Sequence, residues 1–288
     1  MIKAFVLATA LALASAGAAT AQDAVRGNVG AGNADEWEIL PPSPSFGGQE
    51  AYERGDYAEA VRLWRIAADQ GDAEAQNNLG VLYANGQGVR KDDAEALRWY
   101  RLAADQGVLN AQGSLGDFYK NGRGVPKDDA EALRWYRLAA DQGDAGSQYN
   151  VSVSYFEGIA VAQNHAEAMR WLRLAADQGL AVAQHQLASQ YSLGRFIPQN
   201  DAEAARWYRL AADQGDAGAQ FNLGTVFSNG IGVPQNDVEA VRWYRLAADQ
   251  GFASAQLNLG VAHEHGRGVP QRTIARPSVG IVSLPIRA

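Results

Sequence analysis

Five glutamates recur at equal intervals along this sequence, and a regular row of carboxylates could supply general acids and bases for hydrolysis. Each glutamate, however, follows an aspartate or asparagine by three residues, as Glu95 follows Asp92. That spacing is typical of a capping box, in which each of the two side chains bonds to the backbone of the other residue at a helix start. We therefore interpret the row as structural: it consists of Glu95, Glu131, Glu167, Glu203 and Glu239.

A row of tryptophans and several histidines are the other candidates for a binding site. Tryptophans can stack on sugars, but these recur at helical spacing among alanines, which is typical of a buried face. His263 and His265 stand two residues apart, whereas a helical zinc pair needs a spacing of four. His165 is expected to be solvated at the start of a helix. We predict no metal site and a buried row of Trp99, Trp135, Trp171, Trp207 and Trp243.

Composition removes further classes of function. The 288 residues contain no cysteine, which excludes disulfides, a cysteine–zinc site and a thiol nucleophile. With 25 Lys and Arg against 32 Asp and Glu, the net charge is −7, so a basic surface for nucleic acid is missing. The sequence also lacks Ser-x-x-Lys, Gly-x-Ser-x-Gly and the phosphate-binding Gly-x-x-x-x-Gly-Lys. We predict a protein that is not an enzyme and uses no cofactor, metal or nucleic acid.

The elements that position all these residues follow from one repeated string, Ala-Ala-Asp-Gln-Gly. Each copy begins 36 residues after the one before. A strict period of this length is typical of a solenoid, in which each unit buries its apolar face against its neighbours. The copies begin at Ala67, Ala103, Ala139, Ala175, Ala211 and Ala247.

Each unit reads as two helices, shown here for residues 72–107. The first helix carries Ala75, Leu79 and Tyr83 on one face, and Asn85-Gly86 ends it. The second begins near Asp92, and Gly107 provides its left-handed cap. We predict an all-α solenoid, a right-handed superhelix of antiparallel helix-turn-helix hairpins with a 36-residue period.

Internal comparison of the repeats predicts how the hairpins pack. Position 80 is small in every copy, so we expect close approach of the two helices there, with Ala103 and its equivalents as partners. Gln76 recurs unchanged and is expected to bond backbone groups between repeats. The third loop has Ala160 in place of a glycine, and the fourth, Leu193 to Ile197, is expected to lack both loop glycines.

Several motifs allow a family resemblance to be stated. Gln220-Phe221-Asn222-Leu223-Gly224, Gly230-Ile231-Gly232-Val233 and the run from Arg242 to Gly251 resemble the Sel-one-like repeat family, which is related to tetratricopeptide repeats. The resemblance covers about residues 72–271 and implies a binding scaffold, often at the bacterial envelope. Some cysteine-rich relatives are linked to β-lactams or cell-wall fragments. A cell-wall glycan or peptide binder, or a β-lactam-interacting enzyme-like protein, is therefore the alternative.

The first residues of the sequence predict that the protein is exported. Lys3, an apolar run and Ala19-Thr20-Ala21 read as a signal peptide over residues 1–21, which leaves no membrane span after cleavage. The expected location is the periplasm or, alternatively, the extracellular space. The predicted segments after it are a disordered linker (22–45), a cap hairpin (46–71), repeats 72–107, 108–143, 144–179, 180–215 and 216–251, a half repeat (252–271) and an atypical tail (272–288).

The tail does not read as the second helix that the last repeat needs. Pro277 falls in the interior of that helix, where it would break the helix. We expect residues 272–288 to be poorly ordered and the uncovered end to favour self-association.

Positions that vary between repeats are the candidates for a partner-binding surface. Positions 77, 81 and 84 of each unit lie on one stripe of the first helix, which is expected to line the concave side. Neutral variation with ordinary packing between repeats is the alternative interpretation. The stripe is predicted to bind a protein or peptide of the envelope through Asn77, Val81, Asp117, Tyr149, Val153, Phe156, His185, Ser189, Phe221 and Thr225.

Overall fold

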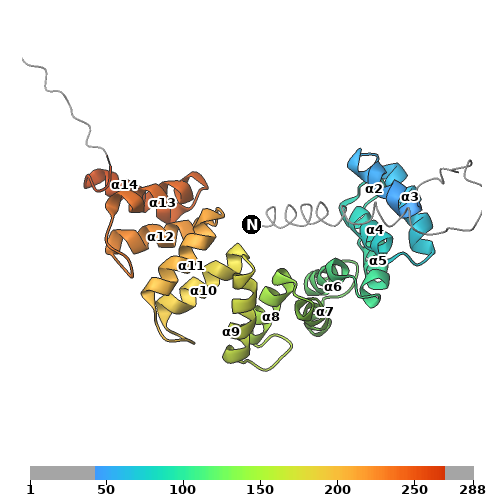
Figure 1. The fold of residues 1–288 in the computed structure, drawn as a ribbon, viewed down its shortest axis with the longest axis horizontal. Helices are drawn as coiled ribbons and strands as arrows, with labels where there is room; N and C mark the ends of the chain where they lie inside the picture. Colours follow the sequence, from blue (N-terminus) through green and yellow to red (C-terminus); the bar gives the residue numbers. More distant parts are fainter. Residues whose placement is uncertain (1–42, 270–288) are drawn as a thin grey trace, which may run out of the picture. The chain divides into compact units, whose positions relative to one another are not determined.

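The computed structural model describes residues 43–269, and this part of the chain is entirely helical, with no strand (Figure 1). The all-α prediction is confirmed. Eleven of the helices are 13 residues long. Each is followed by a glycine-containing turn, and nine of the eleven begin at an Asp or Asn whose side chain caps the first turn. The helices are α2 (Pro44–Glu53), α3 (Tyr57–Asp69), α4 (Ala73–Asn85), α5 (Asp93–Asp105), α6 (Leu109–Asn121), α7 (Asp129–Asp141), α8 (Ala145–Glu157), α9 (His165–Asp177), α10 (Ala181–Leu193), α11 (Asp201–Asp213), α12 (Ala217–Asn229), α13 (Asp237–Asp249) and α14 (Ala253–Glu264).

Consecutive helices pack on each other throughout the described chain, as in a repeat solenoid (Figure 1). We call α4, α6, α8, α10, α12 and α14 the A helices, and α5, α7, α9, α11 and α13 the B helices. Beyond these neighbours, α4 contacts α6 and α6 contacts α8. The first three A helices therefore lie side by side.

The tryptophan row lies in the core, as predicted. Trp99, Trp135, Trp207 and Trp243 are 2–3% exposed, and Trp171 is 7% exposed. The predicted partner of the small residue at position 80 is wrong, however. A Cβ on Gly80 would lie 2.6 Å from the ring of Tyr100, so the tyrosine of the same hairpin, and not Ala103, occupies the space beside it. A small residue at this position leaves room for the ring, and the fourth repeat carries Ala188 there, with Tyr208 in place of Tyr100.

The glutamines at position 76 bond the backbone between repeats, which confirms the prediction. The Gln76 amide donates to the Ala68 carbonyl at the end of α3 (3.1 Å) and its side-chain oxygen accepts from Gln106 (2.8 Å). The same two bonds form at Gln112, Gln148, Gln184 and Gln220. These side chains therefore satisfy helix-end carbonyls that have no partner within their own helix.

Only half of the predicted capping box forms. The Asp92 side chain accepts from the backbone N–H of Ala94 and of Glu95, as expected. Glu95 does not bond back to Asp92: it accepts from Arg98 (2.7 Å), and the Asp92 N–H donates to the Tyr83 carbonyl. The backbone of the preceding A helix thus takes the bond that the glutamate would have made.

The turns after the A helices depend on glycines with positive φ. Gly88 has φ +68° and a Cβ there would lie 2.3 Å from the Tyr57 carbonyl oxygen, so the loop packs directly on the preceding hairpin. The prediction that the fourth loop lacks both glycines is wrong, since Gly194 ends α10 with φ +62° and only the second is replaced. In the third loop Ala160 takes the second position with φ 58°.

The Ala160→Gly variant is expected to be more stable than the wild type by about 0.5–1 kcal/mol. A left-handed conformation costs a non-glycine residue about 1–2 kcal/mol, and the greater freedom of glycine in the unfolded chain offsets part of the gain. Urea denaturation followed by circular dichroism measures the difference. An unchanged or lower midpoint would show that the methyl group makes a stabilising contact.

The first and last described residues can be compared with the predicted segment boundaries. Helix α2 begins at Pro44, inside the predicted linker of residues 22–45, because Ser43 caps it and proline suits the first helical turn. The predicted signal peptide, the rest of that linker and the tail from residue 272 lie outside the described residues. Within 43–269, none of the helices combines the length and apolar character that a membrane crossing requires.

Candidate partner-binding surface

The predicted stripe lies on the A helices, but its residues differ in accessibility. Asn77 is buried with 4% of its surface exposed, so it has no free surface with which to contact a partner. Its side-chain amide donates to Asn78 on the same helix (3.4 Å). The others are half-buried: Val81, Asp117, Tyr149, Val153, Phe156, His185, Ser189, Phe221 and Thr225.

Position 77 faces the start of the next A helix in the fourth and fifth repeats. His185 on α10 contacts Asp216, the N-cap of α12, and the Phe221 ring lies 5.2 Å from the ring of Phe252, the N-cap of α14. The first pair is polar and the second aromatic. Packing between repeats therefore accounts for the residues at these two positions.

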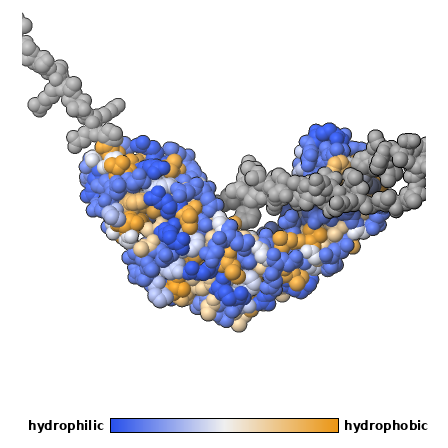
Figure 2. Space-filling model, viewed as in Figure 1, coloured by the Kyte–Doolittle hydropathy of each residue, from blue (hydrophilic) through white to orange (hydrophobic). Residues whose placement is uncertain are grey.

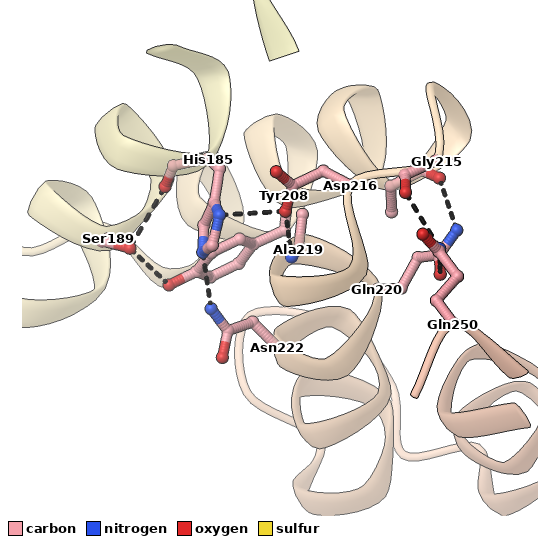
Figure 3. Close-up of polar contacts among 10 residues, drawn as sticks. His185, Ser189, Tyr208, Gly215, Asp216, Ala219, Gln220, Asn222 and Gln250 are labelled. Atoms are coloured by element: carbon pink, nitrogen blue, oxygen red, sulfur yellow. Dashed lines mark hydrogen bonds and ion pairs between the residues drawn. The ribbon is translucent and has the colours of Figure 1, made fainter. Parts of the chain in front are cut away.

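The His185 contact is part of a polar network that joins three helices (Figure 3). The ring Nδ1 lies 3.0 Å from the Asp216 carboxylate, and Nε2 lies 3.0 Å from the side-chain nitrogen of Asn222. Ser189 bonds the His185 carbonyl and lies 3.2 Å from the Tyr208 hydroxyl. When the Asn222 amide donates to Nε2, the ring proton resides on Nδ1 and is donated to Asp216. This arrangement couples the fourth repeat to the fifth.

The pKa of the Asp216 carboxyl lies below its usual value. Burial raises the pKa, but hydrogen bonds from His185 and from the Ala219 N–H outweigh that effect. Because the folded pKa is depressed, the stabilisation is complete above the unfolded value of about 3.9 and is lost as the pH falls through the folded pKa.

The His185→Phe variant is expected to lose less stability in acid than the wild type. Removing the His185 bond lets the pKa of Asp216 rise toward its unfolded value, so less stabilisation depends on its ionisation. Unfolding free energies at about pH 5 and about pH 2.5 measure the difference. Equal losses in the two proteins would contradict this role of the pair. Phenylalanine is the residue that the next repeat carries at this position, in Phe221, which makes it a suitable replacement.

Position 81 faces the B helix of the same hairpin. The Tyr136 hydroxyl donates to Asp117 (2.6 Å), and the Tyr244 hydroxyl bonds Thr225 (3.2 Å). Burial raises the pKa of Asp117, which the Tyr136 bond opposes. The third repeat, which has Leu172 instead of tyrosine, carries the apolar Val153. Comparison of residues 19 positions apart shows this match in the sequence for the second to fifth repeats, whereas the first repeat pairs Val81 with Tyr100.

A second row of residues on the A helices was missed by the sequence analysis. At position 78 every copy carries a neutral side chain with a hydrogen-bonding group, and these side chains are half-buried or exposed. They reach across repeats, since Lys120 donates to Asn150 (3.0 Å) and Asn222 meets His185. Polarity retained at an accessible position is the signal that could have identified them. We call this the amide row: Asn78, Ser114, Asn150, Gln186, Asn222 and Asn258.

An aromatic group occupies the loop edge of the third and fourth repeats. The His165 ring stacks on Phe196 at 3.9 Å, with Phe156 beside both, and His165 Nδ1 is buried without a partner among the described residues. The expectation that His165 is solvated is therefore wrong, because the replaced loop glycine brings an aromatic ring over it. Figure 2 shows that apolar residues on the face in view lie in small groups among hydrophilic ones.

Within residues 43–269, no group of three or more side chains is arranged to hold a metal ion. The glutamates of the capping positions each pair with an arginine one turn away, at the surface. The row of glutamates therefore makes local ion pairs on the B helices.

Comparison with known proteins identifies the repeat. The family model of the Sel1 repeat matches residues 45–72, 73–108, 109–144, 145–180, 181–216, 217–252 and 253–275. A protective antigen of uropathogenic Escherichia coli with an SLR fold is 38% identical with a TM-score of 0.71; the match covers 75% of this chain and 48% of the antigen, so the chain spans about half its length. A Sel1 repeat protein from Oxalobacter formigenes is 31% identical with a TM-score of 0.72, covering 80% and 92%. No curated protein matches the chain.

Proposed function

The chain belongs to the Sel1 repeat family, whose members are generally protein-interaction scaffolds, and from this we propose that it binds a partner protein or peptide along its A helices. The proposed role is non-catalytic: the scaffold assembles or regulates a complex of the bacterial envelope. The proposed location is the periplasm, which rests on the signal-like residues 1–21.

The amide row is the observation that supports this surface most directly. A side-chain amide both donates and accepts hydrogen bonds, so a row of them can pair with the alternating N–H and C=O groups of an extended peptide. Core packing does not require these residues, because the leucines one position later, such as Leu79 and Leu187, already fill the core. Gln186 is exposed on α10 and makes no side-chain hydrogen bond within the described chain.

The half-buried stripe residues extend this surface. Tyr149 and Phe221 precede the amide-row residues Asn150 and Asn222 and are half-buried, as is Phe156 at the loop edge, and aromatic side chains are frequent anchors in interfaces. Asn77 is not included, since it is buried. The proposed surface thus combines aromatic contacts with polar groups able to bond a peptide backbone.

Capture of partners from an envelope extract tests the proposal with a matched pair of variants. Gln186→Arg places a bulky charge in the amide row, whereas Ala166→Arg places the same residue at an exposed site on the B helix α9. We expect the wild type and Ala166→Arg to retain the same protein and Gln186→Arg to lose it. Loss with Ala166→Arg alone would assign binding to the B helices, and retention of cell-wall glycan instead of protein would overturn the proposed partner class.

A further inference from the structure

Helix α14 carries the same packing surface as the other A helices, but no B helix covers it within the described residues. Gln256 is exposed and its side-chain oxygen accepts no bond there, whereas its equivalents accept one from the next B helix. Leu257 and Val261 on the same helix are 68% and 43% exposed. Figure 2 shows apolar residues at this end of the described chain.

The other repeats show what this surface is built to hold. A Cβ on Gly116 or Gly224 would lie 2.4 or 2.7 Å from a tyrosine ring of the following B helix, whereas a Cβ on Gly260 would meet nothing within 4 Å. The open space beside Gly260 is therefore the slot that a tyrosine fills elsewhere. Six residues after that tyrosine, the B helix places the glutamine that bonds the A helix, as in Tyr136 and Gln142.

A depression of about 280 Å³ lies on α13 near the same end of the described chain. Val238, Val241, Leu246 and Gly268 line it together with the charged Arg242, Arg245 and Asp249. Valine at position 238 replaces the alanine that the other B helices carry there. The end of the described array thus offers, on α14, a slot for one aromatic ring and an acceptor for one amide.

We propose that this end face binds an amphipathic helix of a partner protein, one that carries an aromatic residue followed six residues later by a glutamine. This chain does not supply those residues in register, because Gly280 and Ile286 stand 36 residues after Tyr244 and Gln250. A second copy is a poor donor, since each of its B helices is already packed in its own hairpin. The site is separate from the amide row and adds helix capture at the end of the scaffold.

A labelled peptide with the sequence of residues 236–251, which form a B helix, is the probe for this site. We expect saturable binding to the full chain by fluorescence anisotropy. The Gly260→Leu variant is expected to bind at least tenfold more weakly because leucine fills the ring slot. Its own fold should be intact, since the added side chain starts in open space. Peptides with Tyr244→Ala or Gln250→Ala should also bind more weakly.

Three outcomes would overturn the proposal. One is the absence of saturable binding by the full chain. Another is equal affinity of the wild type and Gly260→Leu, which would place the peptide elsewhere. The third is self-association of the wild type, seen by light scattering, that Gly260→Leu abolishes, because the occupant would then be a second copy. The Gln186→Arg variant tests protein binding to the amide row separately. A negative result at one of the two sites therefore leaves the proposal for the other site unaffected.

Discussion

Replacing Trp171 with alanine is expected to lower the free energy of unfolding by about 3–5 kcal/mol, since the change removes a large buried ring and leaves a cavity. Trp171 is 7% exposed in the middle of the array, where repeats on both sides cover it. It also lies where two core clusters meet: its ring packs with the cluster that includes Trp135 and Val151, whereas Leu172 belongs to the next. Chemical denaturation of both proteins measures the loss.

The boundary between the two core clusters at Trp171 also predicts a change in the shape of the unfolding transition. In a solenoid each repeat is stabilised mainly by its neighbours, so a weakened boundary lets the two sides unfold separately. We expect the Trp171→Ala transition to become broader than that of the wild type, with fluorescence and circular dichroism reporting different midpoints. A single coincident transition would show that the two clusters remain coupled.

The control for Trp171→Ala must avoid its neighbour Arg170. The Arg170 guanidinium lies 4.3 Å from the Trp171 ring centre and pairs with Glu167 (2.9 Å), so its substitution also alters the tryptophan's surroundings. Asp177→Asn is a better control, because Asp177 is exposed and makes no ion pair within the described chain. Its effect is expected to be under about 0.5 kcal/mol. Similar midpoints for the two variants would contradict the burial of Trp171.

Leucine at position 80 of two different repeats is expected to have opposite effects. Gly116→Leu should lower stability by about 2–4 kcal/mol, because the side chain displaces the Tyr136 ring and its bond to Asp117. Gly260→Leu should raise stability by about 0.8 kcal/mol, since glycine is a poor helix former and nothing lies within 4 Å of the new Cβ.

Thermal unfolding of both glycine variants against the wild type measures these effects. Leucine is used because Ser152 and Ala188 show that smaller side chains are accommodated at this position. If both variants lose stability equally, then α14 is covered to the same extent as α6, and the end face is not vacant. If neither variant loses stability, the close approach of the Tyr136 ring to Gly116 does not limit which side chain fits at position 116.

The prediction of the stripe shows where reasoning from one sequence stops. Comparing equivalent positions separates constant from variable residues, but it does not show what each variable residue faces. His185 contacts Asp216, and Asp117 contacts Tyr136. Both partners lie in other helices, so exposure at these positions depends on how the hairpins stack. The amide row was missed for a different reason. Its residues vary little between repeats, and positions that vary little were interpreted as structural.

The sequence by itself determined the helices, their period and the buried tryptophan row. These features depend on interactions within a few residues, namely helical spacing of apolar side chains, capping by Asp or Asn and glycine turns, and each is repeated six times. Only the tertiary structure decided which polar groups meet, because those choices depend on distances between hairpins. Asp92 N–H bonds to Tyr83 rather than to Glu95, a tyrosine rather than an alanine faces Gly80, and His165 lies under Phe196. Each of these contacts forms with the residue that the stacking of helices brings closest. The spacing of residues along the sequence does not give distances between helices.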